Sequence, residues 1–145
     1  MWAFEHTETT DATPAQLWRW YCEPQTWPQW DHDTTEVTVD GPFAVGTTGT
    51  ITPRSGPRAA FTFTEVTAEV SFTDTTRLPL ATMTFTHVIG PGPDGRTSLT
   101  HGVTIRGLLA PLFGRVIGTG IARGLPGSMQ RLARLAGAEV PRPAP

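Results

Sequence analysis

The sequence changes its hydrophobic period once, near residue 108, and this change limits the fold more than any other feature. Between residues 34 and 107, apolar and β-branched residues alternate with polar ones in short runs separated by glycine and proline. Such runs, recurring every roughly 8 to 14 residues, predict strands joined as antiparallel meanders. Over residues 108–135 the apolar residues recur at helical spacing instead. We therefore expect the chain to end with one long amphipathic helix that packs on a sheet.

Seven strands are expected in all. The first covers residues 2–9, where apolar and polar positions alternate, and the others follow the two short helical segments described next. Their expected ranges are 34–40, 46–54, 58–68, 70–78, 81–89 and 97–107.

Two short helical segments should separate the first strand from the others. Asp11 or Thr13 can cap a helix of about two turns that ends before Pro24. Residues 23–33 contain two prolines and two tryptophans, which favours a single turn or a short helix. In the long C-terminal helix, Pro126 should introduce a kink.

A length of 145 residues suits one domain, which we place at residues 1–138, followed by a frayed proline-rich tail at 139–145. Cys22 is the only cysteine, so the chain cannot form an internal disulfide. No run approaches the roughly 18 apolar residues that span a bilayer, and the first residues lack the features of a signal peptide. We therefore expect a cytoplasmic protein.

Composition and motifs exclude two classes of partner. The net charge is −2 and the cationic residues are scattered arginines, which argues against nucleic acid. The glycine-rich stretches at 46–50 and 118–124 lack the strand-to-helix context of a phosphate loop or a dinucleotide fingerprint. No cofactor is expected.

Two of the four histidines occupy equivalent places in neighbouring strands, on faces that are otherwise apolar. A three-residue turn at 93–95, with Gly95 in the left-handed conformation, would place His87 opposite His101 and Phe85 opposite Val103. A two-residue turn would split the apolar face, so the pattern favours the first register. Side chains opposite one another have Cβ atoms roughly 4.5 to 5.5 Å apart, close enough for two imidazoles to share a proton or hold a ligand oxygen.

Three interpretations of this pair stay open. In a structural role, each imidazole would bond a hydroxyl, a carbonyl or a buried water. As a site, the pair would polarise a carbonyl or move a proton, with burial and mutual repulsion lowering the basicity of both rings. A metal site would add His6 from the first strand, but without a carboxylate at recognisable spacing the zinc signal is weak, and no metal is assigned.

Two acids share parity with inward apolar residues. Asp74 alternates with Phe72, and Glu65 alternates with Phe63. A buried carboxylate is costly unless it is paired, so either acid would indicate function if it lay inside. For both acids we prefer the interpretation that the strand twists or ends there and the carboxylate reaches solvent.

Local motifs add to the element order. They are WPQWD at 27–31, DGPFAVGTTGT at 40–50, PLATMTFTH at 79–87 and LLAPLFGRVIGTGIARGLPGSM at 108–129. With them, nearly the whole chain resembles the START/Bet v 1-like (SRPBCC) superfamily, in particular its bacterial polyketide cyclase/dehydrase and lipid-transport-like members. The resemblance implies an α+β helix-grip fold, in which a seven-stranded antiparallel sheet curls around the C-terminal helix and encloses an apolar tunnel.

The resemblance also implies a hydrophobic ligand, polyketide-like or aromatic. As an enzyme, the protein would be a cofactor-free polyketide cyclase or dehydratase, with His87 and His101 as catalytic proton donor and acceptor. The alternative is a carrier of lipid or metabolite in which the histidines only bind the ligand. A third possibility is an interaction protein with a filled core. The expected ligand-binding residues are Tyr21, Trp27, Trp30, Phe61, Phe63, Phe72, Asp74, Met83, Phe85, Val103, Phe113, Ile117 and Ile121.

Several of these residues have more than one interpretation. Trp27 and Trp30 can pack the short helix onto the sheet, roof the tunnel mouth, or do both. Asp31 can cap the following turn, which we prefer, or lie at the entrance. The arginine-only part of the C-terminal helix can dock an acyl carrier protein or form a solvated face, which we prefer. Either a monomer or a homodimer is compatible with the sequence.

Overall fold

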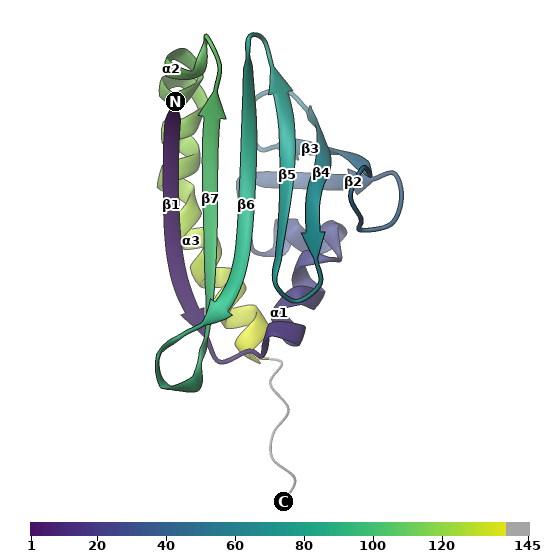
Figure 1. The fold of residues 1–145 in the computed structure, drawn as a ribbon, viewed down its shortest axis with the longest axis vertical. Helices are drawn as coiled ribbons and strands as arrows, with labels where there is room; N and C mark the ends of the chain where they lie inside the picture. Colours follow the sequence, from purple (N-terminus) through teal and green to yellow (C-terminus); the bar gives the residue numbers. More distant parts are fainter. Residues whose placement is uncertain (139–145) are drawn as a thin grey trace, which may run out of the picture.

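Seven strands form one antiparallel sheet in the order β1–β7–β6–β5–β4–β3–β2 (Figure 1). The computed structural model describes residues 1–138, so the predicted tail lies outside the described residues. The strands are β1 (Trp2–Thr10), β2 (Thr34–Val39), β3 (Thr48–Pro53), β4 (Ala59–Thr67), β5 (Ser71–Leu78), β6 (Ala81–Pro91) and β7 (Thr97–Arg106). Each of the seven strands predicted from the alternation is confirmed.

The two short helices after β1 are also confirmed. Helix α1 (Pro14–Tyr21) begins at Thr13, whose hydroxyl accepts a bond from the amide of Gln16, while the side chain of Gln16 accepts one from the amide of Thr13. This capping box satisfies two amides that the first turn leaves without helical partners. The proline-rich segment that follows forms a short 3₁₀ helix, η1 (Pro24–Gln29).

The C-terminal helix is less regular than expected. It consists of α2 (Ala110–Phe113), a π-helical turn η3 (Gly114–Gly118) and α3 (Thr119–Ala138). A Cβ atom on Gly114 or Gly118 would lie 2.6 or 2.7 Å from the indole of Trp2, so these glycines let the ring pack directly on the helix backbone. Helix α3 continues through Pro126, and a π-helical departure from α-helical geometry falls earlier, at Gly114–Gly118.

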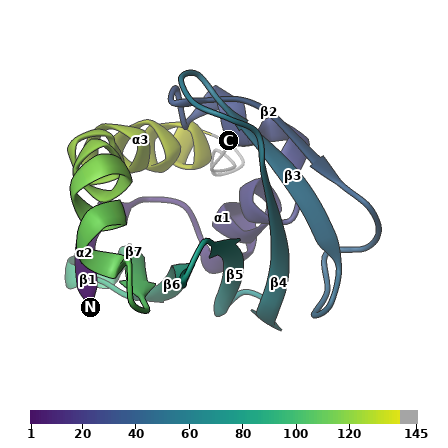
Figure 2. The same ribbon diagram turned by 90° about the horizontal axis from the view of Figure 1, so that it is seen from above.

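The sheet curves from β1 to β2, and α3 runs along its concave side (Figure 2), with α1 at one end of the sheet (Figure 1). Helix α3 packs mainly on β1 and α1, while η1 packs on β2. This arrangement confirms the α+β helix-grip fold. It turns the inner face of the central strands β5, β6 and β7 toward α3.

The predicted register of β6 and β7 is confirmed. His87 lies opposite His101, and Phe85 lies opposite Val103. The amide of Gly92 donates to the carbonyl of Arg96 at 2.8 Å and closes the turn. Asp94 as well as Gly95 adopts a positive φ, of 56° and 75°, whereas only the glycine was expected to do so.

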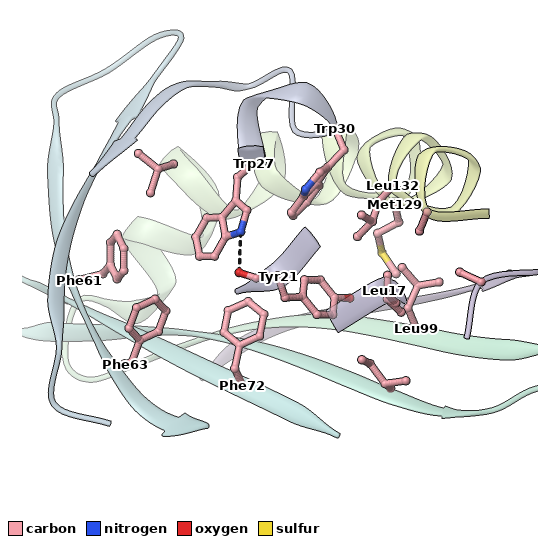
Figure 3. Packing of buried hydrophobic residues seen from close by; sticks show 14 residues of the cluster. Leu17, Tyr21, Trp27, Trp30, Phe61, Phe63, Phe72, Leu99, Met129 and Leu132 are labelled. Carbon is pink, nitrogen blue, oxygen red and sulfur yellow. Dashed lines mark hydrogen bonds between the residues drawn. The ribbon is translucent and has the colours of Figure 1, made fainter. Parts of the chain in front are cut away.

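Buried apolar residues form two clusters, one near α1 and η1 and one near α2. The first contains Ala12, Leu17, Tyr21, Trp27, Trp30, Val37, Phe61, Phe63, Phe72, Ile89, Leu99, Met129, Leu132 and Ala136 (Figure 3). The second contains Ala81, Met83, Val103, Ile105 and Ala110. Histidines and an aspartate on the inner face of the sheet belong to neither cluster, although they are buried among these apolar residues.

Candidate functional site: a histidine row beside a buried aspartate

Three histidines lie in register across three neighbouring strands. His6 of β1 pairs with His101 of β7, which pairs with His87 of β6. The row continues into β5, where Phe72 lies opposite His87. The sequence predicted the central pair, and the strand order adds His6 to one end of the row.

His101 is the most deeply buried of the three, with 2% of its surface exposed. Its Nε2 lies 2.7 Å from the hydroxyl of Tyr21, which α1 projects toward the sheet. Burial, and then the neighbouring His87 and His6, hold the pKa of His101 well below its usual value. Burial likewise raises the pKa of the Tyr21 hydroxyl. The bond therefore joins two neutral groups.

His87, 8% exposed, packs flat against Phe72, with ring centroids 3.9 Å apart and an interplanar angle of 5°. Its Nδ1 lies 3.2 Å from the carbonyl oxygen of Phe72. A carbonyl can only accept, so Nδ1 carries the proton and Nε2 keeps its lone pair. Burial lowers the pKa of His87 to about 3, although the hydrogen bond to Phe72 acts in the opposite direction.

The two buried imidazoles touch but are not bonded to one another. Their centroids are 4.7 Å apart and their planes meet at 72°. In the described residues, each ring bonds a different neighbour, as the structural interpretation expects. Each ring also has a second nitrogen for which no protein partner is found in residues 1–138. Both roles therefore fit the geometry.

His6 stands at the edge of the sheet and is only half-buried. Its Nε2 lies 3.6 Å from a carboxylate oxygen of Glu8. Within residues 1–138, no group of three or more histidine, cysteine, aspartate or glutamate side chains is placed to hold a metal ion. His6 thus joins the row by register, at the edge of the sheet.

Asp74 is the unexpected member of the site. It is buried, with 7% of its surface exposed, and lies between Phe63 of β4 and Phe85 of β6. The preferred expectation that it reaches solvent was wrong, because β5 stays regular for four residues beyond it, to Leu78. Burial raises the pKa of Asp74 to about 7. On this face Asp74 is the diagonal neighbour of His87.

Glu65 shows why parity alone could not separate the two acids. A β-bulge between Phe63 and Glu65 shifts the register of β4 by one residue. Val66 then packs on the core, and Glu65 accepts hydrogen bonds from Ser71 and Thr67. For Glu65 the preferred interpretation, that its carboxylate points away from the core, is confirmed. The cause is the bulge, and not a twist or an end of the strand.

The aromatic residues expected to bind ligand near η1 pack on one another (Figure 3). The indole of Trp27 lies nearly parallel to Phe72 and Phe61, with interplanar angles of 26° and 28°. Its Nε1 donates to the carbonyl of Tyr21 at 3.0 Å. Trp30 is also buried and lies against His101, with centroids 5.8 Å apart. The packing role of both tryptophans is therefore clear.

Sequence reasoning missed one member of this group. Phe43, in the loop between β2 and β3, contacts Phe63 at a centroid distance of 4.6 Å and Phe72 at 5.1 Å. It lies in a glycine-rich stretch with no periodicity, so only its aromatic character could have pointed to the core. Asp31 serves as the predicted cap, accepting bonds from the amide of Asp33 and the hydroxyl of Thr34.

The other expected ligand-binding residues lie near α2 and α3. Met83 and Val103 are buried in the second cluster. Four inward residues packed against that cluster are only half-buried, and we call them the apolar wall: Phe85, Phe113, Ile117 and Ile121. Phe85 belongs to a central strand and faces inward, opposite Asp74 of β5 and Val103 of β7.

A separate cavity of about 550 Å³ opens beside β2. Its lining comprises Cys22, Pro24, Gln25, Val37, Thr38, Val39, Gly41, Pro42 and Phe43. None of the predicted site residues lines this cavity. Phe43 contacts Phe72, which in turn stacks on His87, so these two rings stand between the cavity and the histidine row.

Comparison with known proteins agrees with this architecture. The family model described as polyketide cyclase / dehydrase and lipid transport matches residues 1–137. The chain therefore belongs to this family, and the resemblance to the START/Bet v 1-like superfamily is confirmed. No curated protein sequence matches the chain.

Solved structures show the same fold at low identity. Protein MLL2253 from Mesorhizobium loti is 22% identical with a TM-score of 0.75, covering 95% of this chain and 98% of its own. Ara h 8.0201 is 14% identical with a TM-score of 0.73, covering 95% and 99%. Norcoclaurine synthase from Thalictrum flavum, in complex with dopamine and hydroxybenzaldehyde, is 15% identical with a TM-score of 0.72, covering 97% and 89%.

The helices were also compared with what a bilayer requires. In the part of the chain that the structure describes, no helix has the length and apolar character needed to cross a membrane.

Proposed function

We propose that the protein binds a hydrophobic small molecule between the apolar wall and the histidine row. The half-burial of Phe85 carries this proposal: an inward phenyl ring in a central strand would be fully buried if α3 closed over it. Ile117 and Ile121 on the helix side are left half-buried in the same way. Apolar walls with a few convergent polar groups are typical of small-molecule sites.

The polar end of the ligand would lie at Asp74 and His87. Asp74 is opposite Phe85 of the apolar wall, and His87 is two residues further along the same face of β6. Together they offer a carboxyl group and an imidazole Nε2 that can accept a hydrogen bond. The family description is consistent with either carriage or chemistry at such a site.

A cofactor-free cyclase or dehydratase is the second candidate, and the pKa of Asp74 favours it. A pKa of about 7 suits a group that must both accept and donate a proton near neutral pH, whereas that of His87, about 3, does not. Asp74 would take a proton from a carbon next to a carbonyl group. After that carbon attacks a second carbonyl, Asp74 would return the proton to the alkoxide, while His87 and His101 orient the substrate.

Two space-filling variants test where the ligand binds. Ile121→Trp fills the apolar wall, whereas Val39→Trp fills the cavity beside β2. With the neutral fluorescent probe Nile red, we expect Ile121→Trp to lose binding and Val39→Trp to keep it. The opposite result would move the ligand to the cavity beside β2, and no binding by wild type would overturn the proposal.

Native mass spectrometry of protein purified from its own host addresses the natural ligand. Wild type should retain a discrete hydrophobic molecule, and the Ile121→Trp variant should not. A reaction product, recognised by the loss of water or the closure of a ring relative to a bound precursor, would favour the enzyme over the carrier.

A further inference from the structure

The carboxyl group of Asp74 has no hydrogen bond or ion pair to any side chain or backbone group in residues 1–138, although it is buried. Its oxygens are nevertheless not completely inaccessible to solvent. Within residues 1–138, the fully buried side-chain nitrogen and oxygen atoms without a hydrogen-bond partner are Nε2 of His6 and Nε1 of Trp20 and Trp30. The carboxyl oxygens of Asp74 also have no hydrogen-bond partner but are not among these atoms, so they keep a small solvent-accessible area. A buried carboxylate without a partner is costly, and a ligand that supplies a partner recovers that cost.

Within residues 1–138, no cationic side chain interacts with Asp74. The sequence has no lysine, and every arginine in the described residues is exposed except Arg131. Arg131 is half-buried and donates to the carbonyl of Trp30 and the hydroxyl of Ser128. The two buried histidines are neutral, because burial lowers the pKa of both. An anionic ligand group would find no opposite charge in this interior.

The same surroundings suit a cation. Phe63 and Phe85 flank Asp74 in register on either side, and an ammonium group is attracted to the face of an aromatic ring. His87, diagonal to Asp74, presents an Nε2 that can only accept. Carboxylate, imidazole nitrogen and aromatic rings all favour a positively charged hydrogen-bond donor.

We infer that the ligand carries a protonated amine on its hydrophobic body, and that the carboxylate of Asp74 binds this amine by a charge-assisted hydrogen bond. The inference rests on the proposed function, because it places the amine at the polar end of the same site. Hydrophobic carboxylic acids, such as fatty acids, are excluded by the same charge arrangement. The apolar wall would hold the hydrocarbon or aromatic part in either case.

Three ligands that differ only in the head group test the inference. Decylamine, decanol and decanoate are titrated at pH 8 against wild-type protein carrying Nile red. Decylamine should displace the probe at a concentration at least about tenfold lower than either of the others, because only its ammonium pairs with Asp74. Decanol binding as tightly as decylamine, or decanoate binding most tightly, would overturn the inference.

Two variants then assign the effect to the residue. Asp74→Asn should weaken decylamine binding by about tenfold or more and weaken decanol binding by a much smaller factor, because an amide can still bond a hydroxyl but carries no charge. A cooperative urea transition shows that the variant is folded. Asp94→Asn, at an exposed turn, removes an equal charge and should change nothing. Unchanged decylamine binding by Asp74→Asn would overturn the assignment. If Nile red itself does not bind wild type, the proposed function fails instead.

Discussion

Asp74 and His87 are neighbours on one face of the sheet, and burial moves their pKa values in opposite directions, to about 7 and about 3. Both shifts favour the neutral form, as expected when charge must leave water. At pH 6, therefore, the side chains of Asp74 and His87 are both mostly uncharged. The interior can then be assembled without a buried ion pair, and it acquires a charge only as Asp74 ionises.

Asp74→Asn should change the pH dependence of stability. Between the unfolded pKa of about 3.9 and the folded pKa of about 7, the folded state holds a proton that the unfolded state has lost, so stability falls as pH rises. A shift of this size corresponds to about 4 kcal/mol above pH 7. Relative to wild type, the variant should gain about 2 to 4 kcal/mol between pH 4 and pH 8 in urea unfolding. Parallel curves for the two proteins would contradict this prediction.

Tyr21→Phe should destabilise the protein by about 1 to 3 kcal/mol, because it leaves Nε2 of His101 buried without its partner. Thr7→Val is the matched control. It removes a hydrogen bond of similar length, 2.8 Å between the hydroxyls of Thr7 and Thr100, on the exposed face of the sheet. Urea unfolding should show a small change for the control; equal losses would mean that burial of the Tyr21 bond is unimportant.

At the scale of elements, the contact between β1 and the π-helical turn decides how the C-terminal helix sits on the sheet. Trp2 lies where the side chains of Gly114 and Gly118 would otherwise project. The absence of these side chains lets the helix approach the edge strand closely, and the widened turn is located at the same residues.

Two glycines in this helix should respond oppositely to alanine. In Gly118→Ala the new Cβ atom meets the indole of Trp2, which should cost about 1 to 3 kcal/mol. Gly120 has open space where a Cβ atom would project, so Gly120→Ala should gain about 0.5 to 1 kcal/mol of helix propensity. Thermal unfolding of the two variants measures both effects. A double variant with Trp2→Leu should recover part of the Gly118→Ala loss, and independent effects would contradict the contact.

At the scale of the whole molecule, a curved sheet and one long helix enclose an interior that is closed at the α1 and η1 end and less complete along α3. The buried residues of α3 lie from Ser128 to Ala136, whereas Ile121 near its start and Ile117 in the preceding turn η3 are half-buried. Bound ligand would complete the packing of that less buried part.

Amide hydrogen exchange should show whether bound ligand completes this packing. With saturating Nile red, amides of residues 115–125 and of β6 should exchange more slowly, because local opening of the helix would expose the bound probe. The hairpin of β2 and β3, whose first strand and loop line the separate cavity, serves as the internal control and should be unchanged. Protection confined to that hairpin would contradict binding at the apolar wall.

Most of the fold could be predicted from the sequence because the relevant signals are local. Alternation defined all seven strands, Thr13 and Pro14 marked the start of α1, and the turn at 93–95 set the register that brings His87 opposite His101. The family motifs supplied the curl of the sheet around the helix. The π-helical turn was missed, and the contact made at its two glycines is with the indole of Trp2, more than 100 residues away along the chain.

For the candidate site, the sequence by itself determined which side chains share a face, because parity along a strand and the register of a tight turn are local properties. Only the tertiary structure decided which of them are charged, bonded or accessible. Asp74 and Glu65 looked alike in sequence, yet a bulge turned Glu65 outward, while Phe63 and Phe85 enclosed Asp74. Burial depends on which strands and helices pack together, and burial sets the pKa values and the hydrogen bonds on which the proposed chemistry depends.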